Sequence, residues 1–295
     1  ICADGGTPDD PCDDLWILQD ELYPSTCEGV AEFGTSVAVR GDRIAIGAPF
    51  EDGPASDCGA VYMYERAAGL WSETAKLIAA DPGVGDAFGA AVCLDGDRLV
   101  VGACFDDDPE VDRGSAYVFQ QVAGPWFLER KLTGSSGQAG NLFGFNVDLD
   151  GDLLVIGGHG ADDAGAGTGA AHLFVNGEVG WVEEQRITPP DAAAGDEFGV
   201  GLALHGARLL AGSQRDDDNS LNTSGSAYAF ALSYGGFKRF GFGDGVSVAC
   251  PCGNDSMPGL EQGCRNSLGR GGSLSVAGSD NAAADDFQVI GCNLL

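Results

Sequence analysis

The apolar residues of this chain are grouped in short alternating runs of the kind that form β-strands. In one stretch, Ser36–Val39 and Ile44–Ile46 flank a tight Gly-Asp turn, which indicates a hairpin. An acidic loop then leads to a third run, Ala60–Glu65, and a fourth run begins at Trp71. No helical periodicity interrupts these runs. The pattern therefore predicts a unit of four short antiparallel strands.

The same unit recurs every 55 residues along most of the chain. Repeated four-stranded units of this length are typical of the blades of a β-propeller. Glycine permits a close backbone approach near the axis, and aromatic rings suit the packing between blades. The landmarks are Phe33, Phe88, Phe143 and Phe198, each followed by glycine; Gly47, Gly102, Gly157 and Gly212; and all four tryptophans, Trp16, Trp71, Trp126 and Trp181.

We therefore predict an all-β fold in three parts. Residues 16–235 form a four-bladed β-propeller, residues 1–15 a cysteine-containing N-terminal extension, and residues 236–295 a small disulfide-stapled β-rich segment with strands at 273–279 and 287–290. The repeat begins with a fourth strand, Trp16–Leu22, and ends with a third, Ser226–Ala231. We expect the N-terminal strand to complete the last blade, because closure removes both sheet edges. An open arc joined to a second chain is the alternative.

The units resemble the FG-GAP repeats of integrin α-subunit propellers, and more closely the short bacterial FG-GAP variety. The resemblance rests on Phe33-Gly34 with Ile-Gly-Ala-Pro at 46–49, on Phe88-Gly89 with Val-Gly-Ala at 101–103, and on degenerate pairs in the next two units. It implies a propeller fold over residues 16–235. Integrin-type repeats carry a calcium loop between their first two strands, but here that loop has shrunk to four residues, 40–43, and even 148–152 is too short to wrap a cation. The integrin metal sites are therefore not carried over.

Charge and composition exclude two classes of partner. The chain carries 15 basic and 45 acidic residues, a formal net charge of −30. Nucleic-acid binding through a basic surface is excluded, because phosphate affinity comes from cationic side chains, and docking on anionic lipid is disfavoured for the same reason. No run of eighteen apolar residues occurs, so no membrane-spanning segment is expected.

The cysteines indicate an oxidising compartment. Ten cysteines accompany only three histidines and two methionines, which favours a secreted or cell-surface protein over a zinc protein. The stretches 241–253 and 263–267 are similar to a cysteine-bearing C-terminal module of exported proteins from some marine bacteria, which implies the same location. The chain opens with Ile1, so either a signal peptide has been removed or the segment belongs to a longer chain.

Disulfide partners follow from position along the repeat. We predict a bridge between Cys27 and Cys58, with Cys104 as a competitor for Cys58. Cys93, in an inner strand, is expected to be free and buried. The other suspected bridges are Cys2–Cys12 and two bridges among Cys250, Cys252, Cys264 and Cys292.

Acidic loops between the second and third strands are candidates for calcium. Clustered oxygen ligands suit a hard cation, and the loops of all four units should emerge on one face. The alternative is a solvated acidic rim that keeps an exported protein soluble. The first candidate loop contains Asp216, Asp217, Asp218 and Asn219, and the second contains Asp106, Asp107, Asp108 and Asp112.

Catalytic motifs are not found in the sequence. It contains no His-Glu-x-x-His, Gly-x-Ser-x-Gly or phosphate loop. The three histidines, His159, His172 and His205, occupy drifted repeat positions, which favours structural roles. We therefore expect a non-catalytic adhesion or self-assembly module, a surface or filament subunit that binds protein, its own copies above all, head to tail through the propeller and the 236–295 segment. The alternative is a carbohydrate-binding propeller domain of a secreted hydrolase, although the candidate loops contain only two aromatic residues, Phe50 and Phe105.

Overall fold

The computed structural model describes residues 2–3, 15–26, 30–107, 110–135, 138–162, 165–217, 224–231, 273–277 and 288–292. The chain divides into an N-terminal part, Ile1–Leu232, and a C-terminal part, Ser233–Leu295. In the C-terminal part, β18 (Ser273–Ala277) pairs antiparallel with β19 (Gln288–Cys292). These two strands lie where the sequence pattern placed them.

Among the antiparallel sheets described in the N-terminal part, four correspond to the four predicted units. Sheets 1 to 3 have four strands each, and sheet 4 has three among the described residues. Sheet 1 contains β3 (Ser36–Arg40), β4 (Arg43–Ala48), β5 (Ala60–Ala67) and β6 (Leu70–Leu77). Sheet 2 contains β7 (Phe88–Asp95), β8 (Arg98–Ala103), β9 (Ser115–Gln121) and β10 (Trp126–Leu132). Sheet 3 contains β11 (Asn146–Asp150), β12 (Leu153–Gly158), β13 (Ala170–Gly177) and β14 (Gly180–Ile187). Sheet 4 contains β15 (Phe198–His205), β16 (Arg208–Ser213) and β17 (Ser226–Ala231).

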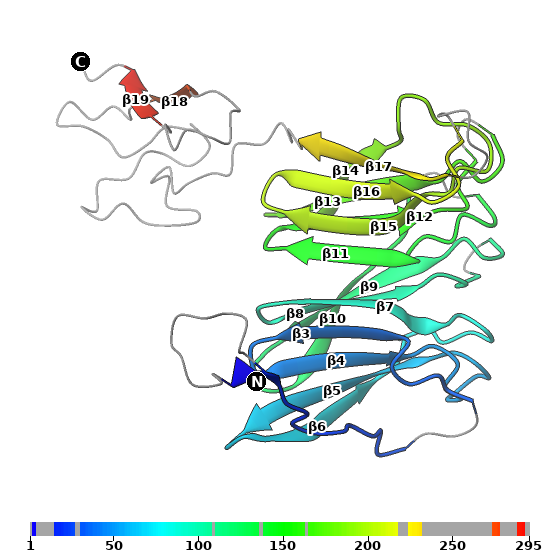
Figure 1. The fold of residues 1–295 in the computed structure, drawn as a ribbon, viewed down its shortest axis with the longest axis vertical. Coiled ribbons are helices and arrows are strands. Elements are labelled where there is room, and N and C mark those ends of the chain that lie inside the picture. Colours follow the sequence, from blue (N-terminus) through cyan, green and yellow to red (C-terminus); the bar gives the residue numbers. More distant parts are fainter. Residues whose placement is uncertain are drawn as a thin grey trace. The chain divides into compact units, whose positions relative to one another are not determined.

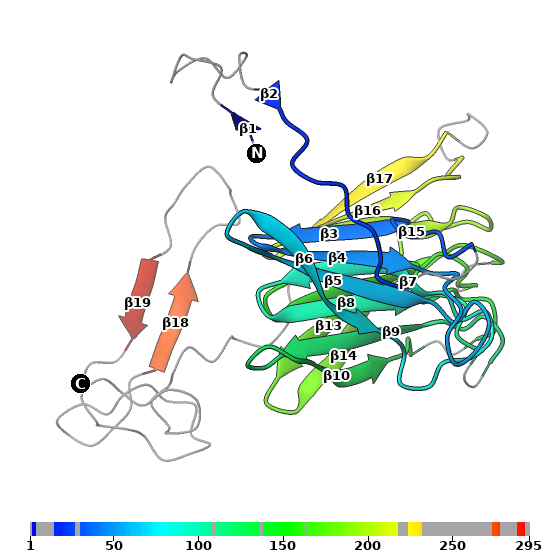
Figure 2. The same cartoon turned by 90° about the horizontal axis from the view of Figure 1, so that it is seen from below.

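The four sheets stack face to face in chain order. Sheets 1 and 4 lie at opposite ends of the stack (Figure 1). Viewed along the stack, sheet 1 is nearest to the viewer and the later sheets lie behind it (Figure 2). The all-β, propeller-like arrangement of repeated antiparallel sheets is therefore as predicted. No helix that could span a membrane occurs in the part of the chain that the structure describes.

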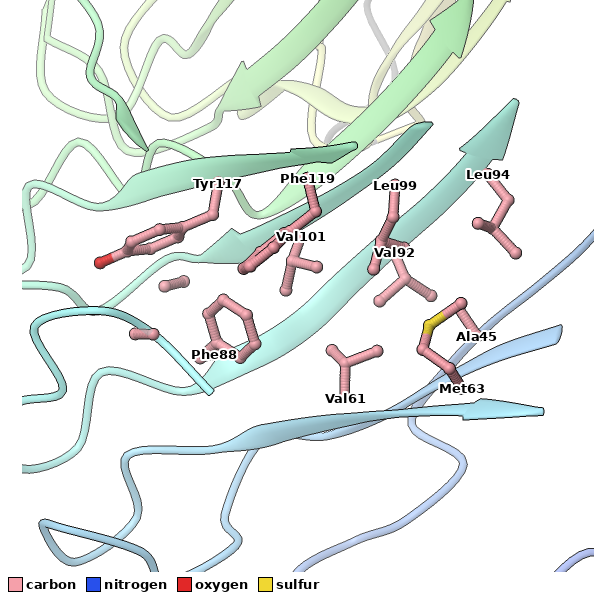
Figure 3. Close-up of a cluster of buried hydrophobic side chains, with 12 residues drawn as sticks. Ala45, Val61, Met63, Phe88, Val92, Leu94, Leu99, Val101, Tyr117 and Phe119 are labelled. Carbon is pink, nitrogen blue, oxygen red and sulfur yellow. The ribbon is translucent and has the colours of Figure 1, made fainter. Parts of the chain in front are cut away.

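Apolar side chains from adjacent sheets interlock between them. Val61 and Met63 of sheet 1 face Phe88, Val92 and other apolar residues of sheet 2 in one buried cluster (Figure 3). The Phe88 ring is fully buried and meets Tyr117 edge to face, with 5.3 Å between ring centroids. Burial of each large side chain of this kind stabilises the fold by about 2 kcal/mol. The Phe-Gly landmark therefore supplies one of the central rings of each interface.

Paired glycines let neighbouring sheets approach. A Cβ atom added to Gly47 would lie 2.0 Å from the carbonyl oxygen of Gly89, the glycine of the next Phe-Gly pair. The equivalent distance is 1.9 Å from Gly102 to the oxygen of Gly144. Because no side chain fits at such distances, both landmark glycines are required by backbone contact between sheets.

The predicted ring closure is not formed in this structure. β2 (Leu15–Trp16) pairs with β1 (Cys2–Ala3), and residues 17–24 continue without a strand. Within the described residues, β17 pairs with β16 alone. The physical reason is distance along the stack. The hydroxyl of Tyr64 donates to the carbonyl oxygen of Tyr23, 2.7 Å away, which fastens this segment to sheet 1, whereas β17 lies at the other end (Figure 1).

Candidate functional site

The candidate calcium loop of sheet 2 begins with a buried and neutralised carboxylate. Asp106 accepts a hydrogen bond from the Tyr117 hydroxyl at 3.0 Å and forms an ion pair with Lys131 at 2.7 Å. Lys131 also lies 2.7 Å from Asp81, whose carboxylate is 2.8 Å from the same Tyr117 hydroxyl, so that the single proton of this hydroxyl is shared between two acceptors. Burial raises the pKa of the Tyr117 hydroxyl, and the Asp106 charge raises it further. Burial alone would raise the pKa of Asp81, but the bonds from Lys131 and Tyr117 lower it.

Sheet 1 contains the same arrangement. Glu51 is buried at the position that matches Asp106, and its carboxylate lies 2.6 Å from the Lys76 ammonium. That ammonium also sits 5.3 Å from the centre of the Tyr62 ring. These lysines were not among the site residues predicted from the sequence. The available signal was a lysine five residues after the landmark tryptophan in both units, at Trp71 and Trp126.

The second acidic residue of each loop braces the loop itself. The Asp107 carboxylate accepts the backbone N–H of Asp112 at 2.8 Å, and Asp52 accepts that of Asp57 at 3.0 Å. Asp57 and Asp112 both have φ near +51°, a left-handed conformation that needs such support. These carboxylates therefore serve loop geometry.

In sheet 4, Asp216 is buried and accepts a hydrogen bond from Tyr228, whose pKa is raised by burial and by that bond. Asp217 is exposed. Asp108, Asp218 and Asn219 lie outside the described residues. Among those that are described, no group of three His, Cys, Asp or Glu side chains is placed to hold a metal ion. Calcium binding stays a prediction.

Sheet 3 replaces the tyrosine with a histidine. Nδ1 of the buried His172 lies 2.7 Å from Glu183, and the Ser135 hydroxyl donates to the same carboxylate at 2.9 Å. Burial would raise the pKa of Glu183, but its bond with His172 lowers it. Because the serine bonds the carboxylate and not the imidazole, His172 is not placed to accept its proton. Ser25 and Glu73 make the same pair in sheet 1 without a histidine.

Three cysteines in the stack are free thiols: Cys58, Cys93 and Cys104. The predicted Cys27–Cys58 bridge and its Cys58–Cys104 alternative are not formed here, and Cys27 lies outside the described residues. Cys93 was expected to be free and buried. It is part-buried, 3.3 Å from Asp148, and burial raises its pKa to about 12.

The remaining predicted bridges are not tested by the structure. Cys12, Cys250, Cys252 and Cys264 lie outside the described residues, and for Cys2 and Cys292 only the backbone strands are described. These pairings stay predictions.

The two end faces of the stack expose residues that are buried elsewhere. Val37 and Val39 of β3 are 67% and 68% exposed, whereas their counterparts in sheet 2, Val92 and Leu94, are 9% and 7% exposed. At the other end, Leu210 of β16 is 50% exposed. It lines an open apolar groove of about 490 Å³ on sheet 4. These faces are the clearest candidate interaction surfaces of the described part.

The fold and these surfaces define a protein of repeated, propeller-like β-sheets. An FG-GAP repeat family model matches residues 16–64, 71–119, 126–174 and 181–230, which together make up more than half of the chain. The chain belongs to the FG-GAP repeat family.

Comparisons with individual proteins add little. One similar solved structure is the crystal structure of the computationally designed Ika4 protein. The two chains are 14% identical in sequence. The alignment covers 70% of this chain and 96% of the Ika4 chain, with a TM-score of 0.39. No curated protein matches.

Proposed function

We propose that this chain is an extracellular, non-catalytic module for self-assembly or adhesion, whose partner is protein. The observation that carries the proposal is the exposure of Val37, Val39 and Leu210 at positions that are buried inside the stack. Large apolar side chains gathered on an exposed sheet face favour association with another protein surface. The first carboxylate of each acidic loop in sheets 1 and 2 is buried and paired with a lysine of the same sheet, which favours a structural role over a catalytic one.

We also propose that assembly completes the propeller. In this view a strand formed by residues 16–22 adds to the edge of β17 through main-chain hydrogen bonds. Secretion or a cell-surface location, the predicted disulfides and a calcium ion at the Asp216 loop belong to the same proposal. The other form that this self-assembly could take is a head-to-tail filament, in which the 236–295 segment of one copy contacts the propeller of the next.

A second candidate is a carbohydrate-binding propeller of a secreted hydrolase. Two aromatic side chains favour it, because Phe50 and Phe105 are 36% and 38% exposed at matching positions of adjacent repeats. Exposed rings at regular spacing are suited to stacking on sugars.

Sedimentation of the full chain over a wide range of concentration, with polysaccharide binding and hydrolysis measured in parallel, separates the two candidates. Concentration-dependent association without binding or turnover is the expected result. A chain that stays monomeric and binds a polysaccharide would overturn the first proposal in favour of the second.

A further inference from the structure

The two end faces carry the two halves of one more sheet-to-sheet interface. Gly212 occupies the position of Gly47 and Gly102, yet a Cβ atom there would meet nothing closer than 3.7 Å. Gly34 occupies the position of Gly89, and a Cβ atom there would meet nothing within 4 Å. In the interior, this pair of glycines is required by backbone contact between sheets. At the ends, the same two glycines are present without that contact.

Apolar residues at the ends show the same relationship. Between sheets 1 and 2, Ala45 and Met63 pack with Val92, Leu94 and Leu99 (Figure 3). The counterparts of the first group on sheet 4 are Leu210 and Ala229, which line the apolar groove. The counterparts of the second group on sheet 1 are Val37, Val39 and Ile44. The outer face of sheet 4 therefore matches the outer face of sheet 1 in position and in chemistry.

A polar contact between adjacent sheets also has its two halves on the two end faces. Arg43 of sheet 1 donates to the carbonyl oxygen of Gly96 at 3.0 Å and pairs with Asp97 at 2.6 Å, both in the first turn of sheet 2. Arg98 makes the same two contacts with the first turn of sheet 3. Arg208 has this position in sheet 4, and the matching turn is Gly41–Asp42 of sheet 1. The end faces are thus complementary in charge as well.

The positions of the two end sheets indicate which copy supplies the missing half. Propellers have about four to eight blades, so a ring built from copies of four repeats has four or eight. A ring of four would bring sheets 1 and 4 of one chain together, and they lie at opposite ends of the stack (Figure 1). Reaching that ring would require a new angle at three interfaces whose side chains are already closely packed.

We propose that two copies of this chain form one eight-bladed ring, in which sheet 4 of each copy packs against sheet 1 of the other. This inference rests on the proposed self-assembly function and adds its partner, stoichiometry and residues. Both interfaces of the ring are identical, so the assembly closes at two copies.

The N-terminal segment is placed to add a strand across this interface. Leu77 ends β6 and leads to Asp81, which is bonded to sheet 2 by the Tyr117 hydroxyl. Leu22, the counterpart of Leu77, likewise packs on the first sheet of its own copy, next to the Tyr23 carbonyl held by Tyr64. Residues preceding Leu22 therefore emerge where the fourth strand of a preceding blade belongs, which in the ring is the edge of β17 in the other copy. Ile17 and Leu18 are both exposed in the single chain.

The test uses two variants of the full chain that each block one face, Val37→Asp and Leu210→Asp. Both side chains are exposed in the single chain, so each variant should fold, as judged by circular dichroism. The exposed valine Val179→Asp, in the β13–β14 turn, is the matched control. The wild type and the control should have the mass of two copies. Each blocked variant should be a single copy, with association at least about a hundredfold weaker, because a carboxylate would be buried in the contact.

Mixing the two variants provides the decisive measurement. The intact sheet 4 of Val37→Asp can pack on the intact sheet 1 of Leu210→Asp, so the mixture should recover a species of two copies. A wild-type dimer that neither variant affects would overturn the inference, as would a mixture that stays monomeric.

Two other outcomes separate the inference from the proposed function. Wild-type species that grow beyond two copies would overturn the closed ring but leave self-assembly standing. A wild-type monomer destabilised by either variant would mean a four-bladed ring within one chain, and it would overturn both the two-copy ring and the self-assembly form of the proposed function, leaving adhesion to another protein.

Discussion

The interior sheets and the end sheets of the stack have related sequences but different surroundings. Val92 and Leu94 are buried between sheets 1 and 2, whereas Val37 and Val39, one repeat earlier, face solvent. Burial of each of the first pair stabilises the chain by about 2 kcal/mol, and exposure of the second pair contributes nothing comparable. The difference shows that the end positions have the residues of an interface that a single chain does not form. Burial of these residues against a second copy would therefore stabilise association.

The largest expected effect comes from the glycine pair. Gly102→Ala would place a Cβ atom 1.9 Å from the Gly144 carbonyl oxygen, so the interior interface must open. We expect a loss of about 3 kcal/mol or more in the free energy of unfolding, measured by denaturant titration.

Gly212→Ala is the matched substitution at the end face. In the single chain it should change stability by less than about 0.5 kcal/mol, because it meets no close atom. It should nevertheless weaken association of the copies, measured by sedimentation. Equal losses of stability for Gly102→Ala and Gly212→Ala at a concentration where the chain is monomeric would mean that sheet 4 is already covered within one chain.

The next effect concerns the buried charges of sheet 2. Lys131→Met removes the ammonium that pairs with both Asp106 and Asp81, which leaves a buried carboxylate without its cation. We expect a loss of about 3 kcal/mol in the free energy of unfolding. Arg66→Met, which breaks the exposed pair with Asp42, should cost about 0.5 kcal/mol. If both variants have only a small effect on stability, the carboxylates of the acidic loops are not held by buried ion pairs, and the interpretation of these loops as a solvated acidic rim is favoured.

The sequence predicted what is local and repeated. The four-stranded units, the Phe-Gly contacts and the all-β fold follow from spacing, because hairpins and glycine contacts are set within one repeat or between neighbours. The closure by Trp16–Leu22 was predicted wrongly for a single chain. Closure depends on the total rotation between sheet 1 and sheet 4, which is the sum of the angles at three interfaces. The pattern of residues does not determine these angles. The buried pairing of Lys131 with Asp106 was missed because acidic residues in a loop suggested a metal, although the lysine lies on the same 55-residue spacing.

Deletion of residues 1–21 tests the added strand separately from the face. The deletion keeps Leu22 and the bond from Tyr64 to Tyr23, so sheet 1 should fold as before. We expect association to weaken by about tenfold or more, and the melting temperature at high protein concentration to fall to that of the Val37→Asp variant. At concentrations where the wild type is monomeric, the two melting temperatures should agree. A lower value for the deleted chain there would show that the segment supports its own chain.

The last expected effect concerns calcium and the association of two copies. Glu21 has the repeat position of Lys76 and Lys131, so adding residues 16–22 to β17 would bring a carboxylate, instead of a lysine, beside the buried Asp216. Clustered carboxylates favour a hard cation with oxygen ligands. Calcium should therefore tighten the association of two copies by about 1 kcal/mol, through binding to the assembled form alone. The measurement is the dissociation constant in calcium and in chelator, with Glu21→Gln as the variant that should lose the difference. Identical constants in the two conditions would leave the acidic loops without a cation and favour the interpretation that they only keep the protein soluble.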